Sequence, residues 1–379
     1  MYDESITFVG MDVHKKMVQV ALLAPGHREP VEWQEPNESA AVQRLARRLV
    51  RESGGDLLAC YEAGPTGYAL QRQLRAAGVP CQVIAPSLTP VKPGERIKTD
   101  RRDARKLAEL LRADLLTEVH PPSESEEALR DLCRCREDAR EDLTRAHHRM
   151  SKFLLRRHCL FTGTKRAWGT RHLAWLHTLH FDDPASQATF DCYLIALDQL
   201  EERLRHLDDE LAARGSEEPY REPVAWLRCF RGIDTVTAVS LVAELHDFRR
   251  FPTPRSLMAF LGLVPREHSS GETKQRGSIT RAGNSHARRL LVEAAWHHRH
   301  RPAISLPLRR RREGQPARII ALADRAHDRL HRRFARLTLR GKPTQKAVVA
   351  VARELAGFLW VILHPEGIQA QRRTHQEGV

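Results

Sequence analysis

The first 120 residues alternate between short apolar runs and amphipathic stretches. The apolar runs, bounded by turn residues, predict five strands, over residues 6–9, 17–23, 31–33, 57–61 and 81–84. Apolar stripes at helical spacing predict three helices, over residues 39–50, 66–77 and 100–115. Three antiparallel strands followed by two strands separated by helices is the order of the ribonuclease H-like fold, although other α/β folds share it. We therefore expect a mixed α/β sheet.

Two heptad patterns follow a break at Pro121-Pro122-Ser123. The first runs from Leu129 to Phe153 in alternating steps of three and four, with Arg136 as its polar position. The second runs from Tyr193 to Leu211. Such seams must be buried against another helix, so the two helices either pair as a hairpin or meet the same helices of a second subunit. The pattern indicates assembly or spacing rather than chemistry.

The remaining chain is predicted to be mostly helical. Helices are expected over residues 284–300, 317–339 and 344–363, with a polar loop over residues 268–276 and the four arginines Arg309 to Arg312 in another loop. The most apolar late segment, residues 347–363, contains Arg353 and Glu354 and is shorter than the roughly 20 residues that a membrane span needs. No membrane span and no secretory signal are expected.

Charge is distributed unevenly along the 379 residues. The net charge is +14, and residues 265–340 alone hold 19 basic and 6 acidic residues, whereas residues 1–120 are almost neutral. Concentrated positive charge favours a polyanion site, so nucleic acid is the expected partner; an arginine-rich solvated surface is the alternative. Seven cysteines without zinc-site spacing favour a reduced, cytosolic protein with no structural metal.

Four carboxylates form the first candidate site. Asp12 lies at the end of the first strand, Glu62 follows a later strand, and Asp100 and Asp103 share one face at a helix start. Acids crowded in this way suit Mg²⁺, which prefers oxygen ligands and can assist reactions on phosphate. Alternatively, Asp100 is a helix cap and Asp103 is an acid favoured by the helix dipole. Asp12 is harder to explain in this way, because an acid within an apolar strand lowers the stability of the fold unless it has a function.

A serine pair forms the second candidate site. Ser269-Ser270-Gly271 is followed within twenty residues by five basic residues, Lys274, Arg276, Arg281, Arg288 and Arg289. A serine hydroxyl attacks phosphorus only when its proton is removed and the phosphate charge is offset, and arginines can supply the second requirement. The alternative is a Ser-Gly turn in a basic loop.

Short motifs surround both candidate sites. The acidic motifs are Gly10-Met11-Asp12-Val13-His14-Lys15, Tyr61-Glu62-Ala63 and the segment Lys98 to Ala108. The later ones are Phe260 to Pro265, Ser269-Ser270-Gly271 and Gly277 to Asn284. Together these motifs resemble the DEDD insertion-sequence transposases, the one-ten family of bacterial insertion sequences. Their order and spacing also agree, so the resemblance covers about residues 5–365. Arg281 differs, because the family often has lysine there, but the charge is kept.

This resemblance implies three domains, a Mg²⁺ site and a serine nucleophile. Residues 1–120 would be a ribonuclease H-like (RuvC-like) domain, residues 121–215 a coiled-coil linker, and residues 216–379 a helical transposase domain. Asp12, Glu62, Asp100 and Asp103 would bind Mg²⁺, and Ser270, or the adjacent Ser269, would be the nucleophile. The implied protein is a cytoplasmic, nucleoid-associated recombinase that forms dimers or tetramers and acts on donor and target DNA under the guidance of a bridge RNA.

Two other functions fit the same residues. One is a Holliday-junction resolvase-like nuclease with the same acidic site, in which water is the nucleophile and Ser270 is incidental. The other is a catalytically inactive nucleic-acid-binding protein, which the presence of all four carboxylates argues against. In every case we expect nucleic-acid contacts from the basic C-terminal region, including Arg309, Arg310, Arg311 and Arg312.

Overall fold

The computed structural model describes residues 5–90, 99–163, 167–270 and 273–364. The chain divides into two units, residues 1–122 and residues 123–379. This division coincides with the Pro121-Pro122-Ser123 break in the sequence pattern. The second unit contains both heptad segments together with the C-terminal helices.

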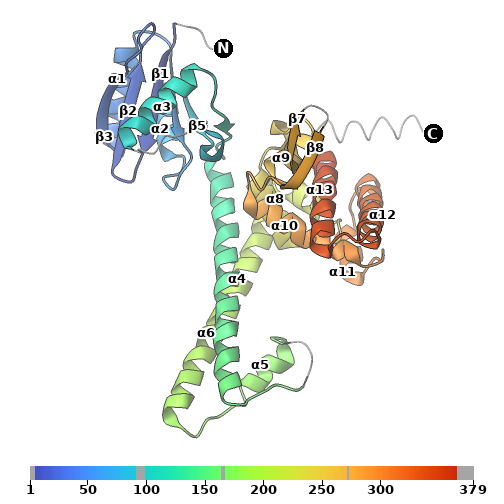
Figure 1. Ribbon diagram of the computed structural model, residues 1–379. Helices are drawn as coiled ribbons and strands as arrows, with labels where there is room; N and C mark the ends of the chain where they lie inside the picture. The colour runs from blue at the N-terminus through green and yellow to red at the C-terminus, as the bar shows by residue number, and fades with distance from the viewer. Residues whose placement is uncertain (1–4, 91–98, 164–166, 271–272, 365–379) are drawn as a thin grey trace, which may run out of the picture. The chain divides into compact units, whose positions relative to one another are not determined.

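The first unit is built on a six-stranded mixed sheet in the order β3-β2-β1-β4-β5-β6 (Figure 1). β1, β2 and β3 pair antiparallel, β4 and β5 run parallel to β1, and β6 is antiparallel to β5. This arrangement is consistent with the expected ribonuclease H-like domain. The strands are β1 (Thr7–Val13), β2 (Met17–Leu23), β3 (Val31–Pro36), β4 (Leu57–Glu62), β5 (Cys81–Ile84) and β6 (Glu118–Val119).

Helices cover both faces of this sheet, because successive strand residues point to opposite faces. One face, with Val9 and Met11 of β1, packs against α1 (Ser39–Ser53) and α2 (Ala69–Ala76). The opposite face, with Phe8 and Cys60, packs against α3 (Asp100–Arg112). A short 3-10 turn, η1 (Pro86–Leu88), follows β5. The sheet is thus the middle layer of three.

The second unit begins with a long helical hairpin. α4 (Glu124–Arg156) and α6 (Pro184–Arg214) pack along each other, with the short α5 (Thr170–Leu176) between them in sequence (Figure 1). The heptad seams lie at this contact, so the hairpin alternative for their burial is the one that the structure contains. The polar seam residue Arg136 donates to Asp208 of α6 across 2.7 Å.

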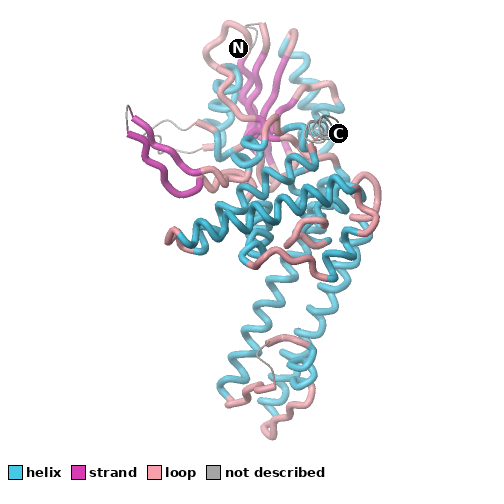
Figure 2. The backbone as a smooth tube through the Cα atoms, turned by 90° about the vertical axis from the view of Figure 1, so that its right-hand side faces the viewer, coloured by secondary structure: helices cyan, strands magenta, loops and turns pink. Residues whose placement is uncertain are grey.

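The rest of the second unit is a helical bundle around one apolar core, which includes Leu129 and Leu211 from the hairpin. A two-stranded hairpin, β7 with β8, extends from these helices (Figure 2). The elements are α7 (Arg221–Leu227), α8 (Thr235–Leu245), η2 (Phe248–Arg250), α9 (Pro254–Phe260), β7 (Pro265–Ser270), β8 (Thr273–Ile279), α10 (Ser285–Trp296), η3 (His297–Arg299), α11 (Leu306–Arg312), α12 (Ala317–Leu339) and α13 (Thr344–Leu363).

Two sequence predictions in this region are wrong. Within the segment 268–276, predicted as a loop, residues 268–270 lie in β7 and residues 273–276 in β8, and the paired residues include His268 with Gln275. The four-arginine run, also predicted as a loop, forms the last residues of α11, whose N-cap Ser305 accepts a hydrogen bond from the Leu308 amide. Neither segment has an apolar stripe long enough to identify its structure.

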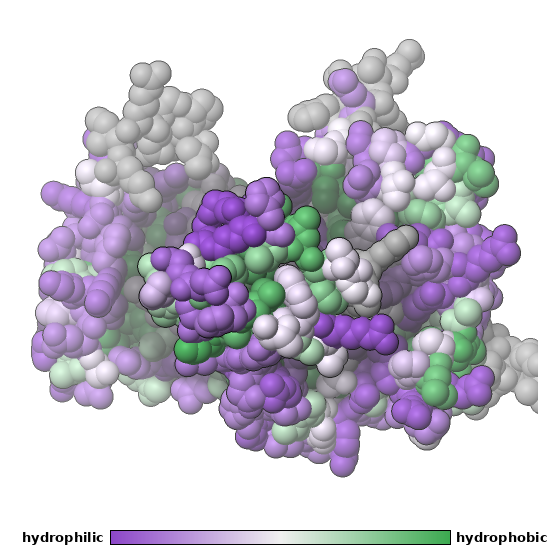
Figure 3. Space-filling view, turned by 90° about the horizontal axis from the view of Figure 1, so that it is seen from below, coloured by the Kyte–Doolittle hydropathy of each residue, from purple (hydrophilic) through white to green (hydrophobic). Residues whose placement is uncertain are grey.

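The surface is mainly hydrophilic where it is seen from below, with hydrophobic residues in small groups (Figure 3). Within the described ranges, no helix combines the length and the apolar character that crossing a membrane requires.

Candidate acidic active site

The ends of two parallel strands bring the first two carboxylates together. β1 and β4 are paired up to Met11 and Tyr61, and the next residues along the two strands are Asp12 and Glu62. Both side chains line one pocket of about 800 Å³ within the first unit. Neighbouring parallel strands end at the same sheet edge, so a strand pattern alone is enough to place these two acids side by side.

Gly10 lets α3 approach the sheet closely. A Cβ atom at Gly10 would lie 2.1 Å from the carbonyl oxygen of Ala104 and 2.4 Å from the amide nitrogen of Ala108, both on α3. Only a residue without a side chain therefore fits at this crossing. The close approach brings the first turn of α3, with Asp100 and Asp103, to the end of β1 where Asp12 lies.

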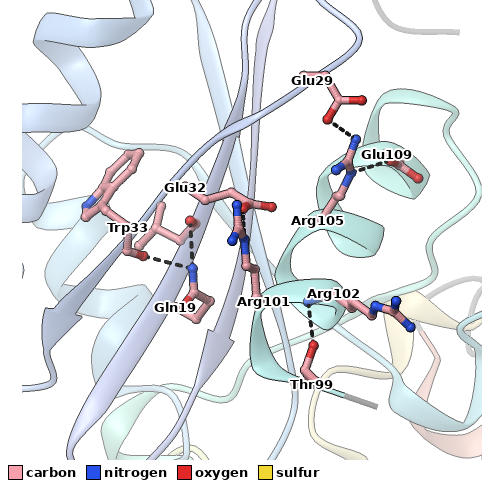
Figure 4. A network of polar contacts seen from close by, with 10 residues as sticks. Gln19, Glu29, Glu32, Trp33, Thr99, Arg101, Arg102, Arg105 and Glu109 are labelled. Atoms are coloured by element: carbon pink, nitrogen blue, oxygen red, sulfur yellow. Dashed lines mark hydrogen bonds and ion pairs between the residues drawn. The ribbon is translucent and has the colours of Figure 1, made fainter. Parts of the chain in front are cut away.

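Arginines on α3 hold the helix against the strands. Arg101 pairs with Glu32 of β3, and Arg105 pairs with Glu29 in the preceding loop (Figure 4). The start of the helix is capped by Thr99, whose side chain accepts a hydrogen bond from the Arg102 amide at 3.4 Å. These contacts fix where the first turn of α3 lies relative to the sheet.

His14 bridges two of the acids. Its Nε2 lies 3.2 Å from Oδ2 of Asp12 and 3.4 Å from Oδ1 of Asp100. One side-chain donor atom from each of these three residues lies within 4.8 Å of the others, and no other group of three or more His, Cys, Asp or Glu in the described part of the chain is so close. Sequence reasoning missed His14 as a site residue. The available signal was its position two residues after Asp12, directly after the end of β1.

The remaining two acids differ in their relation to Asp12, because Glu62 lines the same pocket and Asp103 acts on Asp12 through its charge. Glu62 accepts a hydrogen bond of 2.8 Å from the Thr89 hydroxyl. Burial raises the pKa of Asp12; the charges of Asp100 and Asp103 raise this pKa further, against the opposing effect of His14. Negative charge is therefore concentrated around Asp12 at a cost that a bound cation would relieve.

These donors fit a divalent cation. Asp12, Glu62 and Asp100 offer carboxylate oxygens at one end of the sheet, and Asp103 lies in the same helical turn as Asp100. Hard divalent cations take such oxygen ligands, and a bound cation would supply stabilisation of charge on a phosphate group. Of the four predicted acids, Asp12 and Asp100 lie at ligand spacing, whereas Glu62 lines the same pocket as Asp12 and Asp103 lies one helical turn beyond Asp100, both outside that close group.

The serine pair lies in the second unit. Ser269 and Ser270 are the last residues of β7, paired in register with Lys274 and Thr273 of β8. The side chains of both serines, and those of Lys274 and Arg276, lie outside the described residues, as does Gly271. The backbone therefore places Ser269 and Ser270 at the end of β7, opposite the start of β8.

Comparison with known proteins is decisive for the family. Residues 9–159 match the DEDD transposase family of the IS110 type, and residues 225–306 match the family described as Transposase IS116/IS110/IS902. The transposase for insertion sequence element IS1533 of Leptospira borgpetersenii is 37% identical over 342 residues, which cover 89% of this chain and 99% of that protein. The chain belongs to the IS110 family of insertion-sequence transposases.

Two further relatives agree with this assignment. The y4qE protein of Sinorhizobium fredii, which carries a transposase name, is 43% identical over 356 residues, covering 94% of this chain and 88% of that protein. The transposase for element IS1111A of Coxiella burnetii is 28% identical over 229 residues, covering 59% of this chain and 61% of that protein. A transposase cleaves and rejoins DNA, so DNA is a substrate of this chain.

Several of the arginines predicted to bind nucleic acid form hydrogen bonds or ion pairs within the fold of the transposase. Arg288 donates to the carbonyl oxygens of Leu261 and Ala282, at 2.8 and 3.0 Å, and its burial lowers the pKa of the guanidinium. Arg289 forms ion pairs with Glu137 of α4 and Glu293 of its own helix, at 3.0 and 2.8 Å. Both residues hold α10 in place, whereas Arg281 is exposed.

The four-arginine run of the transposase is divided in the same way. Arg309 and Arg310 are exposed. Arg311 donates to the Ile233 carbonyl at 2.7 Å, and Arg312, only 6% exposed, pairs with Asp324 at 2.7 Å. Arg311 and Arg312 therefore anchor α11, and Arg309 and Arg310 are exposed to solvent.

Proposed function

We propose that this transposase cuts and rejoins DNA through a seryl–DNA intermediate, with Mg²⁺ held by Asp12, Glu62, Asp100 and Asp103 and with a bridge RNA selecting the DNA sites. The observation that carries the metal part of the proposal is the convergence of Asp12 and Asp100 within 4.8 Å, on different elements, beside the Glu62 carboxylate. The serine and the RNA rest on the resemblance of the motifs to the family.

The acidic residues have defined roles in this proposal. Asp12 and Glu62 hold the cation from the strand side, and Asp100 and Asp103 hold it from α3. His14 keeps the Asp12 and Asp100 carboxylates in place through its contacts of 3.2 and 3.4 Å. A bound ion would offset the negative charge on the phosphoryl oxygens during displacement.

Ser270 would act as the nucleophile. Its hydroxyl oxygen forms a bond to phosphorus while the bond from phosphorus to the leaving nucleotide oxygen breaks, and the serine proton passes to a base. The resulting phosphodiester between serine and DNA can be attacked by a second DNA hydroxyl, so cleavage and rejoining become reversible steps. Strand exchange between two DNA molecules requires more than one active site, so we propose a dimer or tetramer.

A denaturing gel of end-labelled DNA tests the serine. We expect a covalent protein–DNA adduct with the unmodified protein, and none with Ser270→Ala. Ser151→Ala, an exposed serine on α4, is the matched control and should keep the adduct. An adduct that is lost in Ser269→Ala but kept in Ser270→Ala would move the nucleophile by one residue. An adduct that survives replacement of both serines would reject serine chemistry in favour of a nuclease that uses water.

A further inference from the structure

A groove between α12 and α13 is lined by arginines that the sequence motifs do not include. It has a volume of about 850 Å³, and five arginines of α12 line it together with two acids, Asp328 of α12 and Glu354 of α13. These arginines are Arg325, Arg329, Arg332, Arg333 and Arg336. We refer to these five residues and Glu354 as the arginine groove.

The arginines are arranged along one side of a helix. Arg325, Arg329, Arg332 and Arg336 follow one another at steps of four, three and four, which places them on one helical face. At about 1.5 Å per residue the row extends for roughly 16 Å. The opposite face of α12 is buried through Ile319, Ala323 and other small or apolar residues. The fold therefore holds this row at the surface.

Three of these arginines are exposed, and within the part of the chain that the structure describes their charge is not neutralised by an ion pair. Arg325, Arg332 and Arg336 are exposed, and none has an acidic partner among the described residues, although Arg332 donates to the carbonyl oxygen of Asp328 at 3.2 Å. A protein that needed these residues only for stability would gain little from unpaired charges held at a spacing of one helical turn, because like charges there repel. Their arrangement suits an extended anionic partner.

Glu354 keeps the other two arginines in place. Its carboxylate oxygens lie 3.0 Å from Nε of Arg329 and 3.0 Å from Nε of Arg333. The carboxylate thereby orients two guanidinium groups and lowers the positive charge of the groove. It also competes with any phosphate that approaches these two side chains.

We propose that the arginine groove binds the phosphodiester backbone of duplex DNA. DNA is the polyanion that a transposase must hold, and regularly spaced phosphates match a row of regularly spaced cations better than a compact acidic ligand does. The contacts would be independent of base sequence. This inference rests on the proposed DNA strand exchange and adds the surface that retains the duplex.

Salt dependence of binding to a short duplex of random sequence tests the proposal. Combining Arg325→Gln, Arg332→Gln and Arg336→Gln should lower the log–log salt slope by about 0.9 for each lost contact, or about 2.7 in total. The matched control replaces three exposed arginines of α4 by glutamine, with the same loss of charge: Arg140, Arg149 and Arg156. We expect the control slope to stay within about 0.5 of that of the unmodified protein.

A second variant should act in the opposite direction. Glu354→Gln removes the competing carboxylate and should strengthen duplex binding and steepen the salt slope. Glu202→Gln, an exposed glutamate of α6, is its control and should change neither. Circular dichroism of each variant establishes that the helices are intact.

Three results would overturn the inference. The first is a triple variant with an unchanged slope, and the second is a control triple with the same loss as the groove triple. The third is a slope that falls for duplex RNA of the same sequence but not for DNA. Failure of the proposed function is separate, because it would be seen as the absence of a covalent adduct in the unmodified protein even where duplex binding follows these expectations.

Discussion

Replacing Gly10 by alanine should damage the acidic site without changing any of its acids. The new Cβ would lie 2.1 Å from the Ala104 carbonyl oxygen, and Cβ atoms essentially never approach another heavy atom within 3.0 Å. α3 must therefore move away from β1 by about 1 Å. Because Asp100 begins this helix and Asp12 lies two residues beyond Gly10, the movement widens the gap between the two carboxylates.

The size of the effect follows from two general magnitudes. Overpacking a close contact costs about 1–3 kcal/mol, which lowers the melting temperature of a small domain by several degrees. A misplacement of about 1 Å at reacting groups can lower the rate about 100-fold. We expect Gly10→Ala to show both losses, with the loss of activity larger than the loss of stability alone would cause.

The assay combines strand-exchange rate with a thermal melt, and calorimetric titration with Mg²⁺ reports on the site directly. Gly55→Ala is the matched control, because a Cβ there would meet no atom within 4 Å and the residue does not adopt a positive φ. Gly55→Ala should behave as the unmodified protein does. If Gly10→Ala had the same strand-exchange rate, Mg²⁺ binding and melting temperature as the unmodified protein, the close contact at Gly10 would not be what positions the acids of α3.

Three further predictions concern the second unit. Arg134→Met should lower the stability of this unit by about 2 kcal/mol in urea unfolding, because the buried Glu244 carboxylate would lose its Arg134 partner at 3.0 Å while keeping Asn284 at 2.7 Å. Burial raises the pKa of Glu244, but the hydrogen bonds from Arg134 and Asn284 hold this pKa below its usual value, so the loss should shrink as acid protonates Glu244. Burial lowers the pKa of His298 to about 3, so protonating this residue costs folding free energy once the pH falls below about 6.5, and His298→Phe should avoid a loss of about 2 kcal/mol in the free energy of unfolding near pH 5. If His298→Phe and the exposed-site variant His180→Phe lost equal stability between pH 7 and pH 5, this prediction would be wrong. Leu143→Lys should lower the melting temperature, because Leu143 is buried in the core between α4 and α6; an unchanged melt would reject its role in that seam.

Long periodic segments of this chain were predictable, and short polar ones were not. The sheet strands and the two heptad helices bury apolar faces. Apolar residues therefore recur every two residues in a strand and every three to four residues in a helix, and this pattern can be recognised from sequence. β7 and β8 form a two-stranded hairpin, which is rich in polar residues and has no such alternation. α11 depends on the contacts of Arg311 and Arg312 with residues distant in sequence, which no local pattern reports.

The candidate site shows the same division. Its acids could be selected from residue type and from their positions at strand ends and a helix start. The approach of Asp100 and Asp103 to Asp12 depends on the absence of a side chain at Gly10 and on the pairs that Arg101 and Arg105 form, and both are properties of how α3 packs. The place of His14 between Asp12 and Asp100 likewise becomes evident only when the helix and the strand are in contact.

The acidic site is the place where we expect this transposase to perform DNA strand transfer. The most direct test measures strand exchange by Asp12→Asn beside Asp56→Asn, an exposed aspartate of the same unit that has the same loss of charge. We predict that Asp12→Asn folds normally, loses strand exchange and loses the calorimetric signal of Mg²⁺ binding, whereas Asp56→Asn keeps all three properties. Normal strand exchange by Asp12→Asn would contradict the account and place the reaction elsewhere in the protein.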